Sequence, residues 1–131
     1  MVYMSNLTRI VLRWIPALAV MLVIFYFSAQ PSFVLPDFGW ADYLVKKGGH
    51  MVGYGLLALA FWHALEWKSD RRWLAWLLTV LYAVTDEIHQ AYVPGRNPSV
   101  WDVVIFDNLG ALISLLASGA LIQQKRPDKK A

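Results

Sequence analysis

Cysteine is absent from this 131-residue chain, and charged residues are scarce at 16%. Without cysteine the chain can form no disulfide framework, no thiolate metal site and no cysteine nucleophile. A soluble domain of this size normally has about a quarter of its residues charged. With 58% hydrophobic residues, the chain has too little polar surface to cover a globule in water. The composition therefore favours an integral membrane protein.

Several motifs of soluble enzymes are missing as well. The sequence has no glycine-rich phosphate loop of the Walker type, no Gly-x-Ser-x-Gly elbow and no His-Glu-x-x-His pair. Asp86, Glu87 and His89 are close in sequence, but neighbouring positions on a helix point about 100° apart, so they cannot easily converge on a metal ion. The basic C-terminal end has no aromatic residues beside it, so no nucleic-acid partner is expected. We expect neither a metal site nor a cofactor.

Four apolar blocks are long enough to cross a membrane as helices. A hydrocarbon core about 30 Å thick requires about 20 residues at 1.5 Å per residue. Because the third block is free of charge only from Trp73 to Thr85, it must continue through its acidic end. The expected spans are residues 10–29, 48–65, 73–92 and 100–122. The fold class is thus all-α, a single domain forming a bundle of four transmembrane helices, followed by a basic tail at 123–131.

The positions of the basic residues predict how the chain is oriented, because Lys and Arg accumulate in cytoplasmic loops. Nine of the twelve lie before or in the first turn of span 1, between spans 2 and 3, or in the tail. The other three are Lys46, Lys47 and Arg96. Both termini are therefore expected in the cytoplasm, with the loops 30–47 and 93–99 outside.

Ionisable residues on three of the expected helices fall at one level. Counted from the cytoplasmic end of each span, His50 lies 15 residues along the second, Asp86 13 along the third and Asp107 15 along the fourth. All lie on the order of 20–25 Å from the inner face. Charges at such depth normally face a bundle interior or a water-filled cavity. We expect an outward-facing pocket formed by Lys47, His50, Tyr54, Asp86, Glu87, Gln90, Arg96, Asp102, Asp107 and Asn108.

Some residues keep two interpretations. Asp102 either caps the fourth helix together with Ser99 or belongs to the pocket. His50 is either an interfacial histidine bound to a backbone carbonyl or a pocket residue. Small residues at Gly49-x-x-x-Gly53 and Gly110-x-x-x-Ser114 predict close packing of their helices.

Several short polar segments follow one another along the chain: Ser28-Ala29-Gln30, Lys47-x-x-His50-x-x-x-Tyr54, Asp86-Glu87-x-x-Gln90-x-x-x-Pro94-Gly95-Arg96, Asp102, and Asp107-Asn108-x-Gly110-Ala111. In this order they resemble the VanZ-like family of small bacterial membrane proteins, and the resemblance covers about residues 25–115. The family's namesake is associated with low-level resistance to teicoplanin. The resemblance implies a role at the outer face of the bacterial cytoplasmic membrane, with a contribution to glycopeptide resistance, but no particular reaction.

Three functions are then open. The first is binding of an anionic lipid or a lipid-linked cell-wall precursor, with Lys47 and Arg96 on its phosphate. The second is an intramembrane acid–base enzyme acting on an envelope lipid or glycolipid, with His50 and Glu87 as the reacting pair and Asp86 as a further candidate. The third is a structural or transport subunit, which the scarcity of polar groups in the inner half of the spans disfavours. Assembly of identical chains stays open.

Overall fold

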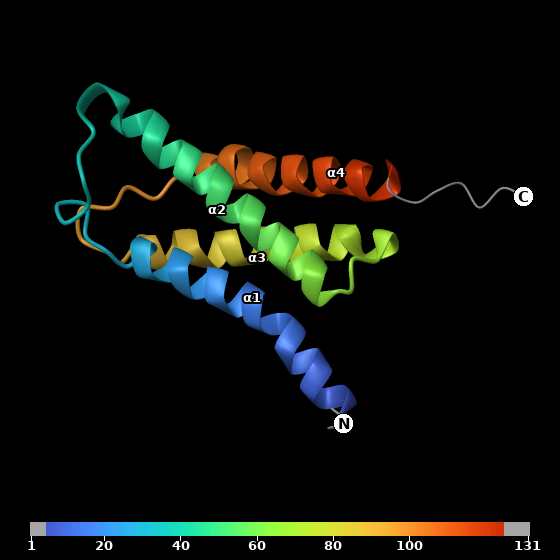
Figure 1. Cartoon of the computed structure of the whole chain (residues 1–131). Helices are drawn as coiled ribbons and strands as arrows, with labels where there is room; N and C mark the ends of the chain where they lie inside the picture. Colours follow the sequence, from blue (N-terminus) through green and yellow to red (C-terminus); the bar gives the residue numbers. More distant parts are fainter. Residues whose placement is uncertain (1–4, 125–131) are drawn as a thin grey trace, which may run out of the picture.

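The computed structural model describes residues 5–124 and is all-helical over that range, with no β-strand (Figure 1). Its long helices are α1 (Asn6–Ser28), α2 (Asp42–Ala64), α3 (Arg72–Gln90) and α4 (Asn108–Gln124). Short 3-10 turns, Gly39–Ala41 and Ser69–Arg71, precede α2 and α3, and a π-helical segment, Asp102–Asp107, leads into α4. The all-α prediction is confirmed. The basic tail lies outside the described residues from residue 125 onward.

The helices follow the expected spans closely at most ends. If the π-helical segment is counted with α4, the largest difference is at α2, which begins at Asp42 instead of residue 48. Asp42 accepts a hydrogen bond from the Phe38 N–H at 3.4 Å and pairs with Lys46 at 2.7 Å. These contacts stabilise a polar first turn ahead of the apolar run, which a count of apolar residues alone does not include.

Helix α2 packs against each of the other three helices and supplies much of the core. Tyr54, Leu57, Phe61 and Trp62 are all buried on it. Figure 1 shows α2 running obliquely past α3 and α4, with the segments 29–41 and 91–99 side by side at one end of the molecule. The polar residues Lys46, Lys47 and His50 lie toward that end of α2, where they share a cavity with residues of both connecting segments.

Close packing of α2 against α4 depends on Gly110. A Cβ atom on Gly110 would overlap the main chain of Met51, and one on Gly55 would overlap the Ser114 hydroxyl. The prediction for Gly110 and Ser114 is therefore confirmed, while the one for Gly49 and Gly53 is wrong. A Cβ on Gly49 would have no heavy atom within 4 Å, and one on Gly53 would make only ordinary contact with Ile24 at 3.8 Å.

The outer surface of the helices is rich in large apolar side chains. Helix α1 shows this most clearly, because only Ala17 and Ser28 are buried among its 23 residues. Two helical stretches, Asn6–Ser28 and Asp102–Gln124, are long and apolar enough to cross a membrane. An apolar surface of this extent is typical of a protein that faces lipid.

Candidate functional site

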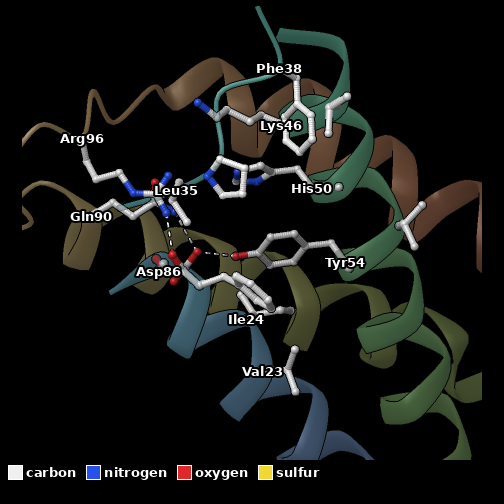
Figure 2. Close-up of a pocket in the computed structure, with 17 residues that line it drawn as sticks. Val23, Ile24, Leu35, Phe38, Lys46, His50, Tyr54, Asp86, Gln90 and Arg96 are labelled. Carbon is white, nitrogen blue, oxygen red and sulfur yellow. Dashed lines mark hydrogen bonds between the residues drawn. The ribbon is translucent and has the colours of Figure 1, made fainter. Parts of the chain in front are cut away.

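Two adjoining cavities lie at the end of the molecule where the connecting segments meet. The larger, about 500 Å³, lies between α1, the segment 30–41 and α2, and is lined mainly by apolar side chains; we call it the apolar compartment (Figure 2). The smaller, about 360 Å³ and mainly polar, includes Lys47, Asn97 and Asp102; we call it the polar compartment. Four side chains line both compartments: Lys46, His50, Gln90 and Arg96.

Asp86 lies on the wall of the apolar compartment. Its Oδ2 accepts hydrogen bonds from the Tyr54 hydroxyl at 2.9 Å and from Nε2 of Gln90 at 3.0 Å (Figure 2). Asp86 is only 5% exposed, and its Oδ1 has no hydrogen-bond partner among the described residues. The expected convergence of Tyr54, Asp86 and Gln90 is therefore present, with one carboxylate oxygen left unpaired.

Two acidic residues of the π-helical segment pair with two basic residues of α2. Lys47 forms an ion pair with Asp102, and Nδ1 of His50 lies 2.9 Å from Oδ1 of Asp107. Both carboxylates are buried. Asp102 lines the polar compartment, and its carboxylate contacts Lys47 instead of the Ser99 backbone, so the capping contact is not found among the described residues.

The π-helical geometry explains how both pairs form at once. Lys47 and His50 are three residues apart on α2 and share a face. Asp102 and Asp107 are five apart, and in a regular α-helix such residues point about 140° away from each other. A π turn closes bonds between residues five apart and brings their side chains closer to one face than an α-helix does. The wide turn therefore aims both carboxylates at α2.

Glu87 has a different role from the one expected. Its carboxylate accepts a hydrogen bond from the Ser99 N–H, so it holds the connecting segment 93–99 against α3. Among the hydrogen bonds of the described residues, His50 contacts Asp107 and not Glu87. The expected His50–Glu87 pair is thus replaced by His50–Asp107.

Arg96 connects the pocket to the end of α1. It donates to the Phe27 carbonyl at 2.6 Å and to the Gln30 carbonyl at 3.1 Å, and so supplies side-chain donors to carbonyls at and just after the end of α1, where intrahelical donors run out. Burial lowers the pKa of Arg96, although the neighbouring Asp86 and Glu87 favour its charged form. Arg96 therefore acts as a structural cap as well as a lining residue.

Gly95 fixes the position of Arg96. It has a φ of 73°, and a Cβ there would overlap the Ser32 hydroxyl. The Ser32 N–H donates to the Pro94 carbonyl at 3.4 Å. The two connecting segments are thereby held together over the compartments.

Asn108 lies apart from the pocket, contrary to expectation. It lines neither compartment, and its side-chain oxygen accepts a hydrogen bond from the Trp76 indole at 2.7 Å. The residue count placed Asn108 far along its span and Trp76 near the inner end of its own. The hydrogen bond between these two side chains shows that such a count does not give depth reliably.

Some lining residues were missed by sequence reasoning. Lys46 lines both compartments, and the apolar compartment also takes Val23, Ile24, Leu35 and Phe38 from α1 and the segment 30–41. The run Phe33-Val34-Leu35-Pro36 is unusually apolar for an exposed loop. This feature of the sequence could have indicated that the segment forms part of an apolar wall.

The described residues thus form a small helical membrane protein with ionisable side chains gathered inside one end. The chain matches the family model described as VanZ/LLP1 over residues 6–121, and it belongs to that family. The matched range includes every lining residue of both compartments, and the suspected VanZ-like relationship is confirmed. Neither the curated proteins nor the solved structures contain a match to the chain.

Proposed function

We propose that this protein of the cell envelope binds an anionic lipid or a lipid-linked cell-wall precursor in its two compartments. The observation that carries the proposal is that an apolar compartment adjoins a polar one through shared basic and polar side chains. An amphiphile likewise has an apolar part joined to a polar part. Its hydrocarbon chain would occupy the apolar compartment, and its phosphate group would lie against Lys46, Lys47 and Arg96.

The basic side chains suit a phosphate ligand. Arg96 uses Nε and Nη2 on carbonyls, and Nη1 has no protein acceptor in the described part of the chain. Lys46 is 39% exposed in its pair with Asp42, so it can exchange that partner at low cost. Charge-assisted bonds from such groups to phosphate are among the stronger hydrogen bonds in proteins.

The ligand would reach the site from the membrane. Val23, Phe27, Val45 and Val52 line the apolar compartment and are themselves exposed on α1 and α2. These exposed apolar side chains would border lipid if both helices span the bilayer. A hydrocarbon chain could then enter sideways between α1 and α2 without crossing water.

The proposed topology is four spans with both termini in the cytoplasm. Helices α2 and α3 have 23 and 19 residues, about 34 and 28 Å at 1.5 Å per residue, close to the hydrocarbon thickness of about 30 Å. Arg13 and Lys68 both pair with Glu66 at the end opposite the compartments. A basic cytoplasmic end would place the site in the outer leaflet of the bacterial cytoplasmic membrane.

Retention of an envelope lipid there supplies a link to the glycopeptide resistance associated with the family's namesake. A lipid-linked precursor held in the compartments would present a different surface to an antibiotic than the free precursor does. The alternative acid–base enzyme has no comparable support, because His50 pairs with Asp107 and Glu87 pairs with the Ser99 backbone.

Native mass spectrometry of the purified protein tests the proposal. The wild-type protein should retain a phosphate-bearing lipid, and Lys46→Met with Arg96→Met, which removes the two basic residues that line both compartments, should lose most of it. The matched control, Lys68→Met with Arg71→Met, removes two basic residues that line neither compartment. Equal retention by both double variants, or no lipid on the wild type, would overturn the proposal.

A further inference from the structure

Two buried polar atoms on the wall of the apolar compartment have no partner. Asp86 and Ser28 both line this compartment and are 5% and 3% exposed. Neither Oδ1 of Asp86 nor Oγ of Ser28 has a hydrogen-bond partner among the described residues. Leaving a buried polar atom unpaired is costly, so a ligand that donates hydrogen bonds to these two atoms would be stabilised by them.

The charges around Asp86 indicate what kind of donor is needed. Four acidic residues are buried at this end of the molecule: Asp86, Glu87, Asp102 and Asp107. Lys47 and His50 pair with the last two, whereas Asp86 receives hydrogen bonds only from the neutral groups of Tyr54 and Gln90. Arg96 is near enough to act on Asp86 through charge, but it donates to carbonyls. Asp86 therefore lacks a directly bound cation.

We infer that the bound lipid carries a primary ammonium group beside its phosphate and that the ammonium binds Asp86. An ammonium supplies a positive charge and three N–H donors, which suits an unpaired carboxylate oxygen on a wall that also has the unpaired Ser28 hydroxyl. The phosphate of the same headgroup would lie toward Arg96, which lines both compartments. This inference rests on the proposed binding of a phosphate-bearing lipid, and it changes the expected ligand from a lipid of net negative charge to a zwitterionic aminophospholipid-like headgroup, in which the phosphate is the anionic group.

Competition among three phospholipids of matched chains tests the inference without any substitution. Phosphatidylethanolamine has a primary ammonium, phosphatidylcholine has a quaternary one with no N–H, and phosphatidylglycerol has hydroxyls and a net negative charge. The purified full-length protein should retain phosphatidylethanolamine at least about tenfold over either of the others, as expected for a hydrogen bond to a charged group. Equal retention of the three, or a preference for phosphatidylglycerol, would overturn the inference but leave the proposed function standing. Failure to retain any lipid would overturn the proposed function itself.

A pair of neighbouring variants locates the effect. Asp86→Asn keeps the shape of the side chain and should abolish the preference for phosphatidylethanolamine over phosphatidylcholine, while Ser28→Ala should reduce it by a smaller factor. Glu87→Gln is the control, because it neutralises a buried carboxylate on the same turn that lines neither compartment, and it should keep the preference. An undiminished preference in Asp86→Asn, or loss of preference in Glu87→Gln alone, would contradict the assignment to Asp86.

Discussion

Nδ1 of His50 lies 2.9 Å from Oδ1 of Asp107, which joins the middle of the polar face of α2 to the end of the π-helical segment. Asp107 is 2% exposed, whereas His50 is half-buried and lines both compartments. The carboxylate therefore orients a ring that a ligand can touch.

Substitution of Asp107 should destabilise the protein. Asp107→Asn removes the charge from a buried hydrogen bond, which we expect to cost about 1–3 kcal/mol and to lower the Tm measured in detergent. Asp70→Asn is the control, because Asp70 is exposed in the turn before α3, and it should change stability by no more than about 0.5 kcal/mol. Equal Tm values for the two variants would contradict the structural role of the pair.

The Lys47–Asp102 pair should show strong coupling. Lys47 and Asp102 are 20% and 10% exposed, so removing either partner should cost about 3–5 kcal/mol by leaving a buried charge unpaired. The double variant Lys47→Met with Asp102→Asn should cost much less than the sum of the single variants.

The exposed Lys46–Asp42 pair is the matched control, since it lies on the same helix with 39% and 27% exposure. Its coupling energy should stay below about 1 kcal/mol. Unfolding by denaturant in mixed micelles measures both cycles, and similar coupling in the two would show that burial of Lys47 and Asp102 has little energetic effect.

Even the smallest side chain at Gly110 should separate α2 from α4. Gly110→Ala places a methyl group on the Met51 backbone, and forcing the helices apart should cost about 1–3 kcal/mol. Gly48→Ala should be neutral or stabilising by up to about 1 kcal/mol, because its Cβ would meet no heavy atom within 4 Å and alanine favours helix. A Gly110→Ala variant as stable as Gly48→Ala would argue against close packing at this point.

Filling the apolar compartment from α2 should block lipid binding without unfolding the protein. Gly49 lines this compartment, and its Cβ position is open, so Gly49→Leu should project into it. We expect several-fold weaker lipid retention with an unchanged Tm. Gly48→Leu adds the same side chain one residue earlier, outside both linings, and should retain lipid normally; matching losses would indicate a general effect of bulk on α2.

The absence of cysteine allows the proposed topology to be tested directly. Pro98→Cys places a thiol in the segment beside the compartments, and Ser69→Cys places one in the turn before α3; both positions are exposed. In intact cells a membrane-impermeant maleimide should label residue 98 and not residue 69, and both should react after lysis. Labelling of residue 69 alone would invert the proposed orientation.

The long helices were predictable because each is dominated by an apolar run. The predicted third span correctly included Asp86 and Glu87, because its 13 charge-free residues alone are too few to cross the hydrocarbon core. The sequence also predicted that His50, Asp86 and Asp107 lie together at one end, because they fall at one level along their spans and charges in membrane helices normally face the interior.

The individual partners were not predictable in the same way. Counting residues treats helices as parallel and regular, whereas α2 runs obliquely and the π-helical segment changes the direction of the side chains beyond it. His50 was consequently assigned to Glu87, and Asn108 was assigned to the pocket. The apolar compartment was missed because a loop wall such as Leu35 and Phe38 has no period for a sequence pattern to detect.

The wide turn at Asp102–Asp107 also makes the length of this stretch critical. Deleting one residue between Asp102 and Asp107 would let the segment relax into an ordinary α-helix and leave the two carboxylates four residues apart, about 40° from each other and still on one face. Adding one residue would place them six apart, pointing about 120° away from each other in an α-helix, so Asp102 could no longer meet Lys47 while Asp107 meets His50. A one-residue lengthening that leaves each of these four amino acids intact should therefore be as damaging as replacing one of them, whereas a one-residue shortening should be tolerated.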